Sequence, residues 1–193
     1  MMASKRCSEW YCCMSHFSIC ASVSERFEML PIMSYMTYET DTRFGKAADF
    51  IETAEEVCGR SIVHSIEEAE PLGPACPLDA LLICPCTGNT LAKLARGITD
   101  TPVCMAAKAH LRSDRPLVIA LASNDALSAN LQNIAVLLSR KQVYFVPMHQ
   151  DDPLHKPHSL VADFSLVIPT LEAAMEGRQL TTRLYPLKSR MTS

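Results

Sequence analysis

The turn from Thr87 to Thr90 holds the residue types whose spacing suggests chemistry most directly. The run Pro-Cys-Thr-Gly-Asn-Thr places hydroxyls, a carboxamide and a glycine at the start of an expected helix, directly after a buried strand. Backbone N–H groups and the helix dipole at such a position favour a bound anion, most simply a phosphate. The alternative is that Thr87 or Asn89 only caps the helix. Both roles can hold together, so this turn is a candidate ligand site.

Two further segments carry polar residues where expected strands end. Ser123 and Asn124 join a buried strand to a helix, where each is either an N-cap or a ligand contact. Ser34 lies at the end of the first expected strand. Arg43 follows it, and its guanidinium either stays in solvent or binds a carboxylate or phosphate through two hydrogen bonds. Ligands of open α/β sheets bind beyond the carboxyl ends of the strands, where we expect these segments to meet.

An α/β fold must position these residues, because short apolar runs alternate with helix-period stretches from Met29 onward. We expect a Rossmann-like open, mostly parallel sheet with helices on both faces. The expected strands are 30–35, 61–66, 80–84, 116–122 and 142–146. The expected helices are 47–58, which Gly59 ends, then 90–98, 102–111, 127–138 and 171–178, with a polar loop over 147–159.

Residues 1–28 do not join this pattern, and we predict an atypical N-terminal segment there beside a single α/β domain over 29–193. A strand at 10–20 would leave only 21–29 for a crossover that normally takes a dozen or more residues. No glycine precedes Gly45, so a glycine-rich phosphate-binding turn is missing from the start of the chain. We therefore expect a first βα unit that is atypical or missing, and poor packing of residues 1–28.

Composition restricts the class of partner. The 193 residues include 18 Lys and Arg against 21 Asp and Glu without a basic run, which gives no electrostatic footprint for nucleic acid. The longest apolar runs are too short for a membrane helix, and we expect a cytoplasmic protein. Nine cysteines without paired C-x-x-C spacing fit reduced thiols and no metal site. Cys58, Cys84 and Cys104 are expected in the core, a catalytic Cys–His pair being the alternative.

Six blocks in order resemble a known family of flavoproteins. The turn at 85–95 with Gly97-Ile98-Thr99-Asp100 is similar to the motif of the flavoproteins that include phosphopantothenoylcysteine decarboxylase and the prenyl-flavin synthases. Within that superfamily, this chain resembles the family of dipicolinate synthase B subunits over about residues 30–180. The blocks that carry this narrower resemblance are 40–45 (TDTRFG), 70–74 (EPLGP), 105–109 (MAAKA), 123–127 (SNDAL) and 150–153 (QDDP) with Lys156-Pro157.

The resemblance implies a polypeptide that works with the A subunit of dipicolinate synthase, a nicotinamide-dependent (NADP or NAD) Rossmann protein, in the mother cell of a sporulating bacterium. The implied reaction is a two-electron oxidation of dihydrodipicolinate to dipicolinate (pyridine-2,6-dicarboxylate), for which a flavin or nicotinamide is the acceptor. It also implies FMN as cofactor and a homo-oligomer. The residues implied to contact FMN are Ser34, Thr87, Gly88, Asn89, Thr90, Ser123 and Asn124. From the residues alone, and not from the resemblance, we predict that Arg43, Lys108 and Arg112 are the cations that bind the dicarboxylate.

The chain departs from the superfamily at two points. The superfamily begins with a strand, a Gly-Ser-x-Cys-Thr turn and a helix, and that turn is absent. No histidine matches the one that performs acid–base work on the first helix of the decarboxylases, so the catalytic residues stay unassigned. The alternatives are an FMN-dependent decarboxylase or prenyltransferase of the same superfamily, and a non-catalytic partner subunit.

Overall fold

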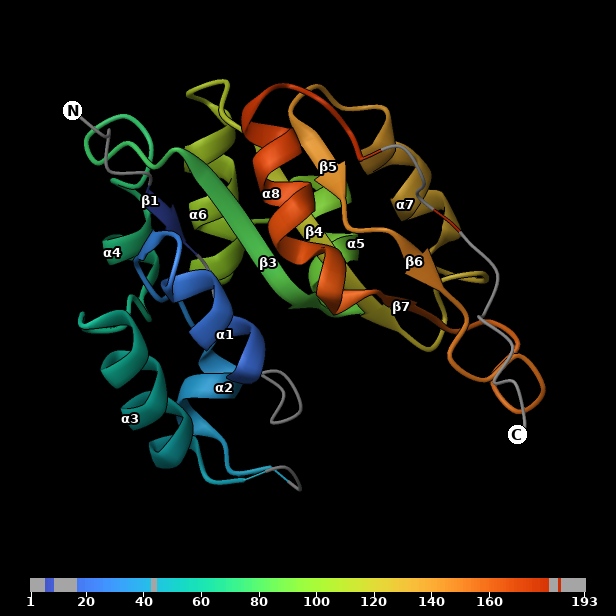
Figure 1. The fold of residues 1–193 in the computed structure, drawn as a ribbon, viewed down its shortest axis with the longest axis horizontal. Helices are drawn as coiled ribbons and strands as arrows, with labels where there is room; N and C mark the ends of the chain where they lie inside the picture. Colours follow the sequence, from blue (N-terminus) through green and yellow to red (C-terminus); the bar gives the residue numbers. More distant parts are fainter. Residues whose placement is uncertain (1–5, 9–16, 43–44, 181–183, 185–193) are drawn as a thin grey trace.

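In the computed structural model, which describes residues 6–8, 17–42, 45–180 and 184, the chain forms a seven-stranded mixed sheet. The strand order begins β2 (Glu28–Met29), β1 (Arg6–Ser8), β3 (Ala80–Cys86) and β4 (Leu117–Ser123), all parallel. The first half of β4 pairs in parallel with β5 (Val143–Phe145). The end of β4 pairs antiparallel with β7 (Leu160–Ala162), and β6 (Met148–His149) lies beyond β7 (Figure 1). The expected open, mostly parallel sheet is confirmed.

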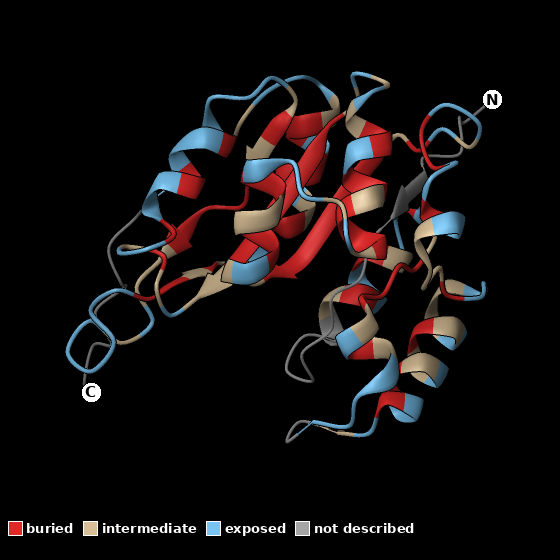
Figure 2. Ribbon diagram, turned by 180° about the vertical axis from the view of Figure 1, so that it is seen from behind, coloured by how far each residue is buried: buried red, intermediate tan, exposed pale blue. Residues whose placement is uncertain are grey.

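Helices cover both faces of this sheet, as the alternation of buried side chains along β3 and β4 requires. Leu82 and Val118 face a core that α1 (Phe17–Ser24) and α8 (Val167–Met175) complete. Leu81 and Ile119 face the opposite core, which α5 (Gly88–Arg96), α6 (Pro102–Leu111) and α7 (Leu131–Leu138) complete. Figure 2 shows the resulting pattern, in which the strands are buried and the outer faces of the helices are exposed.

A smaller group of helices lies beside the β2 edge of the sheet (Figure 1). It contains α2 (Tyr35–Glu39), α3 (Ala47–Cys58) and α4 (Ile66–Ala69). The helix predicted at 47–58 is confirmed at both ends, and Gly59 ends it in the left-handed conformation at φ 63°. Its apolar side packs Phe50 and Ala54 against Met33 in a separate small core.

The strands predicted at 30–35 and 61–66 are wrong. The strand ends at Met29, and residues 30–35 and 61–66 form a single parallel bridge, between Ile32 and Val63. Pro31 has no N–H to donate to a ladder. Serine caps then start helices where the apolar runs suggested strands: Ser34 caps α2, and Ser65 caps α4 in a capping box with Glu68. Local capping chemistry thus overrode a β-like apolar pattern.

Poor packing of the N-terminal segment is wrong for its described part. Cys20, Val23 and Phe27 are 3%, 2% and 5% exposed and pack in the α1–α8 core. The crossover closes because the first strand is β1, which leaves residues 9–27 for the connection to β2. Residues 17–20 are helical, so they are not part of a strand at 10–20. Residues 1–5 and 9–16 lie outside the described part, and the division of the chain at residue 29 stays a prediction.

Three smaller differences occur in the second half. The helix predicted at 127–138 begins only at Leu131, after a series of turns. The loop predicted at 147–159 contains the short strand β6, and the antiparallel strand β7 follows it. The helix predicted at 171–178 starts four residues earlier, at Val167, and ends at Met175. The predicted elements at 80–84, 102–111, 116–122 and 142–146 are confirmed within two residues at each end.

His110 is a fully buried histidine on α6 and gives the fold a pH dependence. Its Nε2 lies 2.9 Å from the carbonyl oxygen of Pro116, so Nε2 carries the proton, and Nδ1 has no partner among the described residues. Burial lowers the pKa of His110 below its ordinary value, and nearby Arg115 acts in the same direction against the opposing Pro116 hydrogen bond.

Replacing His110 by Gln should therefore remove a pH dependence of stability. Because the folded-state pKa lies below the unfolded value of about 6.5, stability is complete above pH 6.5 and falls as the pH drops toward the folded-state value. Between pH 7.5 and pH 5.0, the free energy of unfolding measured with urea should fall more for the wild type than for His110→Gln. The glutamine amide keeps the donor to Pro116. Equal losses in the two proteins would contradict a neutral buried His110.

Candidate functional site

The order of the parallel strands marks one edge of the sheet as the candidate site. Strands β2, β1, β3, β4 and β5 follow the flavodoxin-like order, in which the direction of strand addition reverses between β1 and β3. Loops that leave the carboxyl ends of strands on the two sides of this point diverge and leave a crevice for a ligand. The Thr87–Thr90 turn follows β3, and Ser123 is the last residue of β4.

The Thr87 side chain caps α5. Its Oγ1 accepts a hydrogen bond from the backbone N of Thr90 at 3.4 Å and donates to Thr90 Oγ1 at 3.4 Å. The capping prediction is thus confirmed for Thr87, whereas Asn89 is exposed and does not cap the helix. The N–H groups of Gly88 and Asn89 belong to the first turn and have no carbonyl partner within the helix. The capping role of Thr87 and a ligand site at the same turn are therefore compatible, as expected.

A polar cluster around Asp125 supports this turn from the β4 side. Ser123 Oγ donates a short hydrogen bond to Asp125 Oδ1, and Asn130 Nδ2 lies 2.9 Å from both carboxylate oxygens. Asn133 Nδ2 donates to Asn130 Oδ1 at 2.9 Å. We call these four residues the Asp125 cluster. The hydrogen bonds from Ser123 and Asn130 hold the pKa of Asp125 below its usual range, so the carboxylate is ionised at neutral pH.

Gly88 is the point where the turn and the Asp125 cluster touch. A Cβ atom on Gly88 would lie 2.6 Å from Asn130 Nδ2, 2.6 Å from Ser123 Oγ and 2.9 Å from Asp125 Oδ1. These distances are below van der Waals contact, and the three groups cannot move apart without breaking their mutual hydrogen bonds. Glycine is therefore required here by close approach rather than by backbone conformation. The structure thereby brings together the predicted positions Thr87, Gly88 and Ser123.

The other predicted contacts lie beside Ser123, on the loop after β2, or outside the described residues. Asn124 is exposed beside Ser123. Ser34, which is 6% exposed, follows β2 and caps α2, with its Oγ 3.3 Å from Thr37 Oγ1. Arg43 lies outside the described residues, although neighbouring Asp41 accepts a hydrogen bond from the N-terminus of α3 at 2.8 Å.

Comparison with known proteins decides the family. The model of the Flavoprotein family matches residues 39–165. The B subunit of dipicolinate synthase from Bacillus subtilis (strain 168) is 44% identical over 158 residues, which are 82% of this chain and 79% of the relative. The chain belongs to the Flavoprotein family and, within it, to the dipicolinate synthase B subunits.

Solved structures agree with this family. The crystal structure of the dipicolinate synthase B subunit from Bacillus halodurans C superposes with a TM-score of 0.84 at 35% identity, over 95% of this chain and 98% of that chain. The FMN-dependent cysteine decarboxylase SpaF shares the fold, with a TM-score of 0.64 at 21% identity, over 88% of this chain and 96% of that chain.

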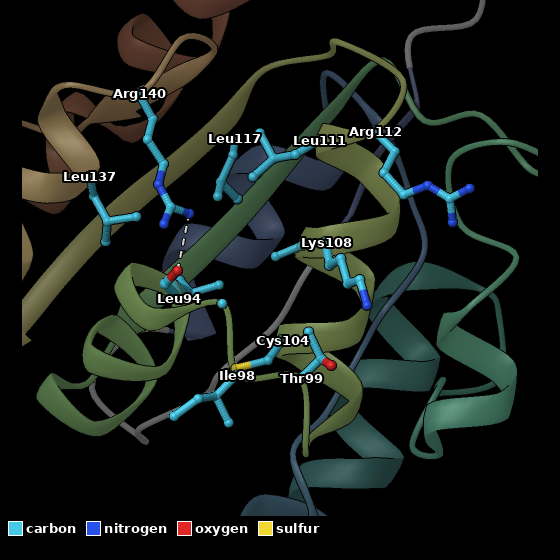
Figure 3. A pocket seen from close by; sticks show the side chains of 12 residues that line it. Leu94, Ile98, Thr99, Cys104, Lys108, Leu111, Arg112, Leu117, Leu137 and Arg140 are labelled. Atoms are coloured by element: carbon cyan, nitrogen blue, oxygen red, sulfur yellow. Dashed lines mark hydrogen bonds between the residues drawn. The ribbon is translucent and has the colours of Figure 1, made fainter.

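Lys108 and Arg112 do not lie at the Thr87–Thr90 turn. Both are exposed and flank a pocket of about 360 Å³ between α5, α6 and α7 (Figure 3). The pocket touches α5 only at its C-terminal end, from Leu94 onward, and a nine-residue helix is about 13 Å long. In Figure 3 the two cationic groups point away from the Leu94 side of this pocket. Their role toward a dicarboxylate stays a prediction.

Cysteines and histidines do not form a metal site in the part of the chain that the structure describes. Cys84 and Cys104 are buried, as predicted, and burial raises the pKa of the half-buried Cys58 to about 11. In the loop at 147–159, His155 pairs with Asp152 at 3.0 Å. Across the described residues no helix combines the length and apolar character that a membrane crossing needs.

Asp125, Asn130 and Asn133 were not among the residues predicted from the sequence. Asp125 lies within the block SNDAL, but nothing in its spacing indicates that its carboxylate receives Ser123 and Asn130. The only available signal was the run of Ser, Asn and Asp after a buried strand, where such side chains bond to nearby groups instead of continuing a regular element.

Gly88→Ala should test the close approach between the two loops. The added methyl group overpacks the Asp125 cluster, and we expect a loss of about 1 to 3 kcal/mol in the free energy of unfolding. Alanine is otherwise favoured over glycine within a helix, so any loss measures the clash. Chemical denaturation gives this quantity. Gln132→Ala, at an exposed position on α7, is the control for substitution away from the turn. Unchanged or increased stability of Gly88→Ala would contradict the contact.

Proposed function

We propose that the chain is the FMN-binding subunit of a two-subunit dipicolinate synthase. With the A subunit it would oxidise dihydrodipicolinate to pyridine-2,6-dicarboxylate in the cytoplasm of the sporulating mother cell. The reaction removes two electrons and two protons from the ring, which becomes aromatic. The identity to the Bacillus subtilis relative supports the reaction. The observation that carries the flavin site is the meeting of the Thr87–Thr90 turn and the Asp125 cluster at the carboxyl ends of β3 and β4, next to the reversal point of the sheet.

The residues at this edge fit a flavin nucleotide. Exposed Asn89 and Asn124 and the first N–H groups of α5 supply donors and acceptors for the polar parts of such a ligand. Gly88 lets the backbone of the turn lie directly against the Asp125 cluster, so the start of α5 is held rigidly. The buried Ser34 offers a hydroxyl on the β2 side of the same edge. Bound FMN would supply a two-electron acceptor.

The chain's own contribution would be to bind and orient. Thr87 fixes the first turn of α5, Asn89 and Asn124 hydrogen-bond the ligand, and Ser34 and Ser123 contact it from the two sides. The six glycines are too far apart for a G-x-G-x-x-G fingerprint, so the nicotinamide (NADP or NAD) is assigned to the A subunit. We also propose a homo-oligomer, because Leu131, Val136 and Leu138 leave apolar surface exposed on α7.

Asn89→Ala should weaken FMN binding without harming the fold. Asn89 is exposed, and losing one hydrogen bond to a charged or polar ligand group costs up to about 1.5 to 3 kcal/mol, or roughly a 10- to 150-fold rise in the dissociation constant. Fluorescence titration of the apoprotein measures this constant. Gln132→Ala removes an exposed carboxamide from α7 and should bind FMN as the wild type does. An unchanged constant for Asn89→Ala would count against a flavin contact at Asn89.

Dipicolinate formation should require both polypeptides. The purified chain with NADP and dihydrodipicolinate should give no turnover, and addition of the A subunit should start it, as followed by ultraviolet absorbance of the pyridine product. Sustained production by the chain alone would sink the two-subunit assignment. Full activity with a flavin-free preparation would favour a non-catalytic partner, and decarboxylation or prenyl transfer by the chain alone would favour a stand-alone enzyme.

A further inference from the structure

The hydroxyl proton of Ser123 is used in a hydrogen bond within the Asp125 cluster. An ionised carboxylate only accepts hydrogen bonds, so the bond between Ser123 Oγ and Asp125 Oδ1 must use the single hydroxyl proton of Ser123. The half-buried Ser123 therefore offers only lone pairs to any ligand at this edge. A phosphate oxygen also only accepts, and it would find no proton on Ser123.

The orientation of Asn130 fixes this arrangement. Asn130 Nδ2 faces both oxygens of Asp125, and Asn130 Oδ1 accepts from Asn133 Nδ2. Reversing the Asn130 amide would place its oxygen against the carboxylate and its NH₂ group against that of Asn133. The direction of each hydrogen bond is thus fixed: Ser123 and Asn130 donate to Asp125, and Asn133 donates to Asn130.

The negative charge of Asp125 also disfavours a ligand phosphate beside Ser123. Its carboxylate is supported by neutral donors, and no ion pair to it is found in the described part of the chain. It lies against Gly88, the first residue of α5, where it meets the positive end of the helix dipole. A second anion at this corner would face the carboxylate across a short distance and be repelled.

We propose that the corner formed by Ser123 and Asp125 accepts a hydrogen bond from an uncharged ring N–H of the bound ligand and excludes its phosphate. Asp125 is a positioning residue, because it acts by turning the Ser123 hydroxyl into an acceptor. The assignment rests on the proposed function and specifies which part of the ligand meets the β4 loop. The N–H can belong to the flavin ring, or to the substrate ring in a dihydropyridine isomer that carries one, such as the 1,2- or 1,4-dihydro form.

Comparing FMN with riboflavin tests this assignment, because riboflavin has the same ring without the phosphate. Dissociation constants of both flavins are measured for the chain in complex with the A subunit, for wild type and Ser123→Ala. Loss of one ordinary hydrogen bond should weaken both flavins equally, by about fivefold. If the substrate ring is the donor, both flavin constants stay unchanged and the KM for dihydrodipicolinate rises about fivefold with kcat little altered. Either result supports the acceptor corner.

Two results would overturn it. Weakening of FMN with unchanged riboflavin would place the phosphate at Ser123. No change in either flavin constant or in KM would remove Ser123 from the site. A wild-type complex that binds neither flavin and whose activity needs none would instead overturn the proposed function, and this assignment with it.

A paired exchange separates positioning from simple structural support. Asp125→Asn puts an NH₂ group against that of Asn130 and should weaken ligand binding about tenfold or more. In the double variant Asp125→Asn with Asn130→Asp, every donor again faces an acceptor. The new aspartate at position 130 accepts hydrogen bonds from both Asn133 and the new asparagine at position 125. Binding should return to within about twofold of wild type. A double variant that folds, as judged by its thermal unfolding, but binds as weakly as Asp125→Asn would contradict the positioning role.

Discussion

The close contact of Gly88 with the Asp125 cluster is the constraint on which the functional edge depends. Two loops from neighbouring parallel strands meet there with no room for a single methyl group. The contact fixes the start of α5 relative to the end of β4, and it does so with side chains that are themselves held by hydrogen bonds. Ligand groups at this edge would therefore meet a surface whose donors and acceptors are already oriented, which lowers the entropic cost of binding.

Helix α5 links this edge to the rest of the molecule, and a different charged residue compensates the helix dipole at each of its ends. Asp125 lies at its N-terminus, whereas Arg140 donates to the carbonyl oxygens of Leu94 and Ala95 at its C-terminus, at 3.1 and 2.8 Å. Both charges have the sign that the helix dipole favours. The apolar pocket flanked by Lys108 and Arg112 belongs to this second end, so its chemistry is separate from that of the Gly88 corner within one chain.

The sequence predicted the elements with strong, unambiguous periodicity and failed where short-range chemistry competed. The helix at 47–58 carries a clear apolar face and a glycine stop, and the strand at 80–84 is apolar on both faces, so both were predictable. Ser34 and Ser65 start helices inside strand-like runs, because their side chains cap the first turns locally. In the site, the turn at 87–90 was visible from its residue types. The role of Asp125 was not visible, because it depends on Asn130 five residues away and on Gly88 at the start of α5.

The most direct measurement of the central claim is a crystal structure of the chain saturated with FMN. The flavin should lie at the carboxyl edge of the sheet, in contact with the Thr87–Thr90 turn, with its phosphate away from Ser123 and Asp125. Flavin density in the pocket between α5, α6 and α7, or an FMN phosphate seated against Ser123, would contradict it.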